Sequence, residues 1–365
     1  MKTVRHSARA RIAAVGIATT GAMILAGCGA ANESGSTGSS STSVSGTISG
    51  AGASTQQAAT QAWVAGFQTT NPNATINYDP SGSGAGRTQF EGNGVDYAGS
   101  DAYITGAEIQ KAQSRCGGDY VEVPDYISPI AIVFNLPGVT SLQLTPSLIG
   151  KIFNKKITMW NDPAIAAVNA GVTLPNLAIS TVHRSDKSGT TMNFTDYLSQ
   201  AAAADWPYKA SDTWPTQGGE AAQGTSGVVG AVKAGQGTIA YADDSQAGGL
   251  GKAKVQVGST YVDPSAAGAA KLAESATRVT DGGQYAFAYK LPRTTTDPSM
   301  YPVTLVSYFI ACAKYPDAAK AALVKSYLTY VISADGQAAA AKAAGSAPLS
   351  DTLRSTIMPA VAAIS

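Results

Sequence analysis

The chain has 365 residues, of which 44% are hydrophobic and 13% are charged, and its formal net charge is +1. This length is enough for one large or two medium-sized folded units with hydrophobic cores. Four cations, Lys2, Arg5, Arg9 and Arg11, precede the first apolar run, and removing four positive charges from +1 leaves −3. A chain without excess positive charge is not expected to bind nucleic acid.

The N-terminal region has the pattern of an export signal. Residues 12–26 are apolar but too short and too rich in small residues for a membrane span, so residues 1–27 are predicted to be a signal peptide. The sequence Leu25-Ala26-Gly27-Cys28 resembles the bacterial lipoprotein box, in which the cysteine is acylated and becomes the mature N-terminus. The alternative is an ordinary cleaved signal with an incidental cysteine. Residues 28–45 are predicted to be a flexible Gly/Ser/Thr tether, which would leave an exported domain anchored to the outer face of the cell membrane by lipid on Cys28.

Two further cysteines, Cys116 and Cys312, remain after Cys28 is assigned to lipid. In an oxidising compartment the expectation is that they form one disulfide, and the alternative is two buried free thiols. The spacing does not match a metal site, and the chain has only two histidines, His6 and His183. A zinc site is therefore not expected, and neither a metal nor a cofactor is predicted.

Helical and strand patterns alternate along the chain, which predicts an α/β fold with parallel strands and crossover helices. Strands are expected at 74–78, 95–99, 120–124, 130–135, 179–183, 238–241 and 303–309. Helices are expected at 55–67, 87–91, 104–114, 162–170, 191–200, 226–234, 316–332, 337–344 and 352–363, with a further helix starting at Thr145-Pro146.

The segment from His183 to Thr191 is the first candidate binding site. It follows a predicted strand, opens a predicted helix and carries Arg184, Ser188 and Thr190. A guanidinium, hydroxyls and free backbone N–H groups at a helix N-terminus together form an anion receptor. His183 is expected to be a packed strand residue rather than a ligand. The segment therefore predicts a site for a small oxyanion.

Three other segments contain polar or glycine-rich turns near predicted strand ends. Ser54 lies before a helix and could be its N-cap, with its hydroxyl and the following N–H groups facing a ligand. The turn at residues 81–86 (Ser-Gly-Ser-Gly-Ala-Gly) allows close approach of an anion, but it matches neither a Rossmann nor a P-loop motif. Asp101 follows a predicted strand, and taken alone it would be assigned as the cap of the helix near Ile104.

A carboxylate beside an anion is repulsive unless the anion carries a proton. Protonated phosphate can donate an O–H bond to Asp101, whereas sulfate at neutral pH cannot. A site built around a specific hydrogen bond rejects an analogue that lacks it by roughly 10⁴ or more. Asp101 beside Arg184 therefore favours phosphate as the ligand.

Several motifs in order, between about Ile48 and Leu349, resemble the phosphate-binding protein of the bacterial phosphate-specific ABC transporter, the Pst system. They are Gly50-Ala-Gly-Ala-Ser54, Tyr78 with Gly82-Ser-Gly-Ala-Gly86, Val95-Asp-Tyr-Ala-Gly-Ser-Asp101, Leu148-Ile-Gly-Lys-Ile-Phe153 with Met159-Trp-Asn-Asp162, and Arg184-Ser-Asp-Lys-Ser-Gly-Thr190. Several separated motifs in the family order are more specific than any one of them.

The resemblance implies a role for each matching residue. Ser54 would bind phosphate through its hydroxyl, Thr55 through its backbone N–H, and Ser83 through its hydroxyl and amide. Asp101 would accept the phosphate proton, Arg184 would form the ion pair, and Ser188, Gly189 and Thr190 would supply donors. Two positions depart from the family: Thr55 replaces a usual aromatic residue, and Lys187 stands where glycine is common.

The family architecture implies a two-lobed, type II periplasmic-binding-protein-like fold that closes around its ligand like a hinge. The expected lobes are residues 46–128 with 303–365, and residues 129–302, with strand crossings near 126–133 and 301–306. The implied function is to bind inorganic phosphate and deliver it to the membrane permease and ATPase subunits of an importer. This division puts both Cys116 and Cys312 in the first lobe.

Three alternatives remain open. A receptor for sulfate, molybdate or an organic phosphate would use similar segments, although Asp101 argues against it. A hydrolase could use Ser188 with His183 and Asp186, but a strand end directs three such close residues apart, and the Gly-x-Ser-x-Gly elbow is missing. A surface adhesin on the same scaffold would not need all the anion-facing segments.

Overall fold

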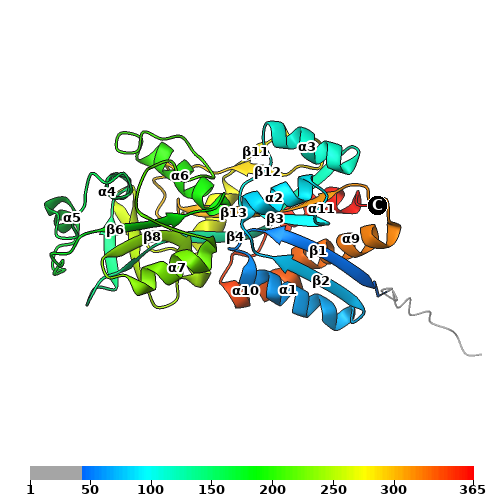
Figure 1. Cartoon of the computed structure of the whole chain (residues 1–365), viewed down its shortest axis with the longest axis horizontal. Helices are drawn as coiled ribbons and strands as arrows, with labels where there is room; N and C mark the ends of the chain where they lie inside the picture. The colour runs from blue at the N-terminus through cyan, green and yellow to red at the C-terminus, as the bar shows by residue number, and fades with distance from the viewer. Residues whose placement is uncertain (1–42) are drawn as a thin grey trace, which may run out of the picture. The chain divides into compact units, whose positions relative to one another are not determined.

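A single strand of 16 residues, β4 (Tyr120–Asn135), joins the two halves of an 11-stranded sheet. Its first part pairs antiparallel with β13 (Thr304–Cys312), and its second part pairs antiparallel with β8 (Thr238–Asp243). The computed structural model describes residues 43–365 (Figure 1). Because β4 and β13 both run through the middle of the sheet, they connect its two halves.

The remaining strands extend the sheet on both sides of this pair. From β13 the order is β3, β1, β2; from β4 it is β8, β6, β7, and β9 pairs with β4, β5 and β10. These strands are β1 (Gly46–Gly52), β2 (Ala74–Asp79), β3 (Tyr97–Ser100), β5 (Ser141–Leu144), β6 (Ser180–Arg184), β7 (Glu220–Ala222), β9 (Gly251–Val257) and β10 (Thr260–Val262). A separate pair is formed by β11 (Thr277–Val279) and β12 (Ala288–Lys290).

Helices cover both sides of the sheet. In Figure 1, α2 and α6 lie above the strands and α1 and α7 lie below them. The helices are α1 (Gln57–Thr70), α2 (Ser83–Glu91), α3 (Ala107–Cys116), α4 (Pro146–Phe153), α5 (Pro163–Val168), α6 (Gly189–Ala201), α7 (Gly224–Ala234), α8 (Ala266–Glu274), α9 (Ala318–Ile332), α10 (Ala334–Ala344) and α11 (Asp351–Ala362). A short 3-10 turn, η1, spans Asp244–Gln246.

The predicted α/β class is confirmed, and most predicted elements occur within a few residues of their expected bounds. On α1, Ala59, Trp63 and Phe67 are buried on one face, as their spacing predicts. Thr145 and Asp162 cap α4 and α5 through their side chains, each before a proline at the start of the helix. The expectation of parallel strands is confirmed only in part. The β1–β2, β1–β3, β6–β8, β6–β7 and β5–β9 pairs are parallel, whereas the β9–β10 pair and every pair that includes β4 or β13 are antiparallel.

Residues 120–124 and 130–135 are both strand, as predicted, but the break expected between them is wrong, because both belong to β4, which is continuous through Pro124 and Pro129. The register shifts where Ser307 faces Tyr126 and Tyr308 faces Pro124, which leaves Asp125 as the extra residue of a bulge. A bulge accommodates a residue that cannot donate to the ladder, and it redirects the side chain that it carries. Asp125 is fully buried and accepts a 2.7 Å bond from Gln56.

Cys116 and Cys312 form a disulfide, with Cα atoms 5.1 Å apart and 196 residues between them in sequence. The bridge joins the end of α3 to the end of β13. The alternative of two free thiols is therefore wrong. The signal peptide (1–27), Cys28 and nearly all of the tether (28–45) lie outside the described residues, and β1 begins at Gly46. From Ser43 onward, no helix combines the length and the apolar character that a bilayer crossing requires.

Candidate functional site

The eight predicted binding residues come together where strand ends meet helix starts. Their side chains or backbones are nearly inaccessible to solvent. They lie after β1 (Ser54, Thr55), at the start of α2 (Ser83), after β3 (Asp101), at the end of β6 (Arg184) and at the start of α6 (Ser188, Gly189, Thr190). Convergence at strand ends is where α/β proteins generally bind ligands.

Asp101 is the acceptor at the centre of this cluster. Its Oδ1 accepts hydrogen bonds from the hydroxyls of Thr55 (2.7 Å) and Ser307 (2.8 Å), and its Oδ2 accepts one from Thr190 (3.2 Å). Burial raises the pKa of the carboxyl, while the bonds from Thr55 and Ser307 and the charge of Arg184 oppose that rise. These hydroxyls therefore favour the ionised, proton-accepting form of the carboxyl, which burial disfavours.

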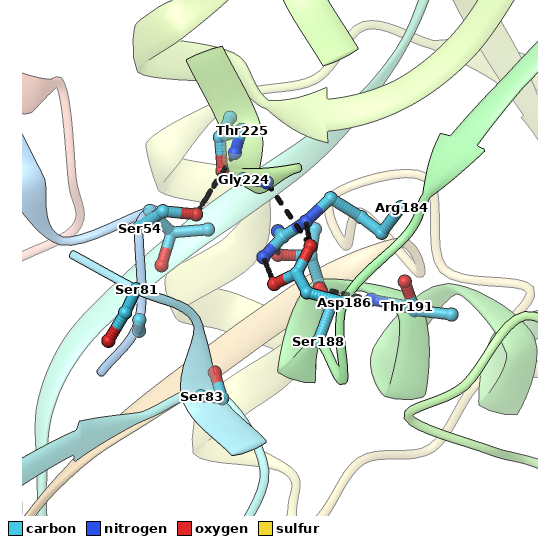
Figure 2. Close-up of polar contacts among 12 residues, drawn as sticks. Ser54, Ser81, Ser83, Arg184, Asp186, Ser188, Thr191, Gly224 and Thr225 are labelled. Carbon is cyan, nitrogen blue, oxygen red and sulfur yellow. Dashed lines mark hydrogen bonds and ion pairs between the residues drawn. The ribbon is translucent and has the colours of Figure 1, made fainter. Parts of the chain in front are cut away.

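Arg184 supplies the buried positive charge, and its side chain is only 3% exposed. Its Nε and Nη2 form a bidentate pair with Oδ1 (2.7 Å) and Oδ2 (2.5 Å) of Asp186 (Figure 2). Nη1 lies 3.4 Å from the Thr190 hydroxyl. Burial alone would raise the pKa of Asp186, but the bonds from Arg184 and the Gly224 N–H outweigh it, so the pKa is lowered. The pair fixes the guanidinium plane and leaves one edge for another acceptor.

The first turn of α6 lies beside Asp101. Ser188 is its N-cap, and the Ser188 hydroxyl accepts a 3.2 Å bond from Thr191 N–H. The Ser188 N–H donates a 2.8 Å hydrogen bond to the carbonyl of Asp212. The N–H groups of the first turn have no acceptor within the helix, and the helix dipole makes this end positive. The turn is therefore suited to an anion.

The space around residue 189 is too small for a side chain. A Cβ on Gly189 would lie 2.6 Å from Asp101 Cβ and 2.8 Å from the N of Ala102. Only glycine lets the start of α6 approach the end of β3 this closely. The donor turn and the acceptor carboxylate are therefore in direct contact.

Ser54 links its segment to α7. Its hydroxyl lies 3.0 Å from the Thr225 hydroxyl and accepts a 3.0 Å bond from Thr225 N–H (Figure 2). Its carbonyl accepts from Gln246 at 2.8 Å. The expectation that Ser54 caps α1 is wrong, because Gln56 occupies the N-cap position and the Ser54 hydroxyl bonds to Thr225.

The glycine-rich segment opens α2, which begins at Ser83 instead of the predicted residue 87. Gly82 has φ +104°, a conformation that favours glycine, and its N–H donates to the Gly52 carbonyl at 2.7 Å. Gly84 N–H donates to the Lys187 carbonyl at 3.0 Å. The Ser83 hydroxyl accepts a 3.1 Å bond from Asp101 N–H. The segment thus contacts both Asp101 and the Arg184 loop.

Two alternative roles do not fit the geometry. Asp101 is not the cap of the next helix, because α3 begins at Ala107 with Gly106 at its N-cap. The hydrolase arrangement is also absent: Nδ1 of His183 contacts the Arg184 carbonyl at 3.0 Å, and the ring stacks on Trp214 at 5.1 Å. Ser188 bonds within its own helix instead of to His183. His183 is a packed residue, as predicted.

Sequence reasoning missed three residues of this network. Ser307 is inside β13, Thr225 is in the first turn of α7, and Asn193 is on α6, where it donates to the carbonyl of Asp101 at 2.7 Å. The Gly224-Thr225-Ser226 sequence before an apolar helix is a signal for a polar helix start that could have identified Thr225. A serine within an apolar strand has no such local signal.

The site combines one buried cation, one buried carboxylate acceptor, several hydroxyls and a helix N-terminus. This donor set is suited to an oxyanion that carries a proton. Within residues 43–365, no three His, Cys, Asp or Glu side chains are grouped as metal ligands.

Comparison with known proteins places the chain in a family. Residues 37–335 match the model of the PBP superfamily domain. The chain is 37% identical to phosphate-binding protein PstS 3 of Mycobacterium leprae, over 96% of this chain and 98% of that protein. It is 35% identical to phosphate-binding protein PstS 2 of Mycobacterium tuberculosis, over 97% and 98%.

Solved structures agree on the fold. A high-affinity periplasmic phosphate-binding protein, PfluDING, bound with phosphate, superposes with a TM-score of 0.71 at 23% identity, over 86% of this chain and 93% of that one. A phosphate-binding protein from Stenotrophomonas maltophilia gives 0.66 at 21% identity, over 86% and 93%. The fold is therefore the two-lobed periplasmic-binding-protein fold, and the chain belongs to the PBP superfamily, among the PstS phosphate-binding proteins, which are binding proteins and not enzymes.

Proposed function

We propose that this protein is an extracytoplasmic receptor that binds inorganic phosphate between two lobes and delivers it to an ABC importer. The observation that carries the proposal is the contact between Asp101 and the first turn of α6, beside the Arg184 guanidinium. The PstS names of the full-length relatives support the same ligand.

The ligand class follows from the mixture of donors and one acceptor. Arg184 and the α6 N-terminus attract any oxyanion. Asp101 distinguishes among them, because its carboxylate form, which the bonds from Thr55 and Ser307 favour, repels an anion that has no proton to donate. Protonated phosphate satisfies both requirements, whereas sulfate satisfies only the first.

Each predicted residue has a role in this proposal. The Ser54 and Ser83 hydroxyls and the Thr55 N–H donate to phosphate, and Asp101 accepts its proton. Arg184 forms the ion pair, and the groups of Ser188, Gly189 and Thr190 complete the donor set. In the structure the Ser188 N–H already has a partner, but its hydroxyl, which accepts a bond from Thr191, can still donate to the ligand. The Thr55 side chain adds a hydrogen bond to Asp101.

The lobes proposed are residues 46–128 with 303–365, and residues 129–302. β4 and β13 would then contain the crossings, and phosphate would bridge the lobes. Polar contacts cross between the proposed lobes: Thr225 to Ser54, Asn193 to the Asp101 carbonyl, and Arg87 to Asp212 (3.0 Å). Closure would exclude water and strengthen the polar contacts with the ligand.

The anchoring part of the proposal rests on the sequence before Ser43. The Leu-Ala-Gly-Cys box at 25–28 supports lipid on Cys28, with residues 28–45 as the tether. The permease and ATPase of a phosphate importer are the proposed partners. Mass spectrometry of the exported protein should find lipid on Cys28, and an unmodified N-terminus further along the chain would contradict the anchor.

The decisive experiment for the ligand is calorimetry of the purified mature protein after removal of co-purified phosphate. Titration with phosphate should show tight binding of one ion per chain, and titration with sulfate should show no heat of binding. Equal binding of both ions would favour the alternative of a general oxyanion receptor. Binding of an organic phosphate in preference to the inorganic ion would favour the other alternative.

A further inference from the structure

Asn193 connects two backbone segments of the site. It lies on α6, is 8% exposed, and uses its Nδ2 to donate to the Asp101 carbonyl (2.7 Å) and to the Gly189 carbonyl (2.9 Å). Asp101 follows β3, and Gly189 begins α6. One amide therefore joins the backbone of the carboxylate acceptor to the backbone of the donor turn.

Arg293 determines the direction of that amide. Its Nη2 donates to Asn193 Oδ1 at 2.7 Å. A guanidinium can only donate, so the amide oxygen must face Arg293 and the NH₂ group must face the two carbonyls. The orientation is thus set by chemistry.

Arg293 is itself held firmly, and its side chain is only 2% exposed. Its Nη1 donates to the carbonyls of Pro302 (3.1 Å) and Thr304 (2.6 Å), and its Nε pairs with Asp196 at 2.8 Å. Thr304 begins β13, the strand that also carries Ser307. The guanidinium therefore ties the segment before β13 to α6, and through Asn193 to Asp101.

We propose that Asn193, oriented by Arg293, is a positioning residue that holds Asp101 against the first turn of α6 and slows the release of phosphate. This inference rests on the proposed function. Neither Asn193 nor Arg293 is among the residues proposed to contact phosphate. Because the bond from Asn193 to the Asp101 carbonyl exists only when the two segments are in contact, it stabilises the closed arrangement, and its loss speeds opening and dissociation.

The test compares phosphate dissociation from purified Asn193→Ala and wild type by rapid-mixing chase with unlabelled phosphate. Loss of the one buried hydrogen bond that depends on contact between the segments predicts a dissociation rate about five- to tenfold faster, with less change in the association rate. Asn169→Ala is the matched control. Asn169 is also buried and its Nδ2 also donates to two carbonyls, of Gln143 and Ile165 (both 2.9 Å), but it joins α5 to β5.

A merely structural role for Asn193 would lower the urea midpoint in both variants and leave phosphate dissociation at the wild-type rate. Wild-type dissociation from folded Asn193→Ala would overturn the proposal. If that variant does not fold, Arg293→Lys decides, because lysine keeps the charge but cannot make all the bonds of the guanidinium. Faster dissociation is expected from the Arg293→Lys variant, and an unchanged rate would overturn the positioning role of Asn193.

The double variant tests whether Arg293 acts through Asn193. If it does, adding Arg293→Lys to Asn193→Ala should cause little further acceleration, whereas a fully multiplicative effect would contradict the assignment of Arg293. Calorimetry of the wild type separates the two hypotheses. If the wild type does not bind phosphate, the proposed function itself is wrong. If the wild type binds normally and the variants are unaffected, only the positioning role of Asn193 is wrong.

Discussion

The Thr55 hydroxyl donates a 2.7 Å hydrogen bond to Oδ1 of Asp101. Thr55 is fully buried and stands where the family usually has an aromatic residue. Ser307 donates to the same oxygen at 2.8 Å, so two hydroxyls occupy Oδ1 and orient the carboxylate with Oδ2 toward Thr190 and Arg184. The departure at Thr55 is thus explained by a specific bond.

Replacement of Thr55 with valine removes this donor while keeping the side-chain volume. The pKa of Asp101, already raised by burial, should rise further, because Thr55 lowers it. We expect phosphate affinity near pH 6 to fall by about five- to tenfold, which corresponds to about 1–1.4 kcal/mol, the net contribution of one ordinary hydrogen bond. The loss should diminish at pH 8, where more of the carboxyl is ionised.

Thr60→Val is the control for this variant, since Thr60 is a buried threonine on α1. Calorimetry at both pH values compares the two. Equal affinity losses at pH 6 and pH 8 would show that Thr55 acts only through packing.

Replacement of Asp101 with asparagine should relax the discrimination between phosphate and sulfate. The amide no longer repels an unprotonated anion, and it can donate to it. We expect measurable sulfate binding and a fall in selectivity of at least about a hundredfold from the roughly 10⁴ expected of a site that reads a specific hydrogen bond. Competition calorimetry with both ions measures the ratio.

Asp125→Asn is the matched control, because Asp125 is a second buried carboxyl whose pKa is raised well above its usual value by burial. It belongs to the same buried network through Gln56, which also donates to Ser307. Selectivity should be unchanged in this variant. An equal loss of selectivity in both would assign the effect to the network and not to proton acceptance by Asp101.

Replacement of Arg184 with alanine should severely weaken phosphate binding. The guanidinium is buried, and removing it also leaves Asp186 without its bidentate partner. We expect a loss of about 2–5 kcal/mol, as for a desolvated charge pair. Asp186→Asn keeps the cation and should cost less. Micromolar or tighter binding by Arg184→Ala at high salt would contradict the role of this residue.

The candidate site was largely predictable because its residues lie beside local signals. Arg184, Ser188 and Gly189 open a helix after a strand, and Asp101 follows another strand end. Ser307 and Thr225 were not predicted. Their partners are 206 and 171 residues away in sequence, and only the pairing of β13 and the docking of α7 bring them together. Such contacts depend on tertiary topology, which single-sequence patterns do not contain.

In the fold, too, local patterns were informative and tertiary contacts could not be predicted. β9 alternates buried and half-buried residues from Gly251 to Val257, a strand signal that the predicted elements nevertheless omit. The continuity of β4 through two prolines had no local signal, because proline usually ends a strand or marks its edge. The bulge at Asp125 resolves this conflict only when β13 is in place.

The disulfide should contribute to stability and not to binding. Cys116→Ser with Cys312→Ser opens a covalent loop that spans 196 residues of sequence. We expect a loss of about 2–5 kcal/mol in the free energy of unfolding, the range for removal of a native disulfide. Phosphate affinity should stay within about twofold. A large loss of affinity in the folded variant would show that the bridge also positions β13 and Ser307.

Glu122 should make the folded protein less stable as pH rises. Its side chain is fully buried, and burial raises the pKa to about 8, with only the bond from Ile104 N–H (2.8 Å) favouring the charged form directly. Oε2 has no partner among residues 43–365. Because the folded state holds this proton more tightly than the unfolded chain, stability is greatest below the ordinary glutamate pKa and falls as pH rises to about 8.

Glu122→Gln isolates this contribution, since glutamine keeps the shape and the acceptor for Ile104 but cannot ionise. The free energy of unfolding from urea titrations should fall less steeply with pH in the variant. The difference in slope should be about 1.4 kcal/mol per pH unit between roughly pH 4.5 and pH 8. Asp243, whose pKa burial raises to about 7, remains in both proteins and gives the residual dependence. Identical slopes would mean that Glu122 already reaches water or a cation when it ionises.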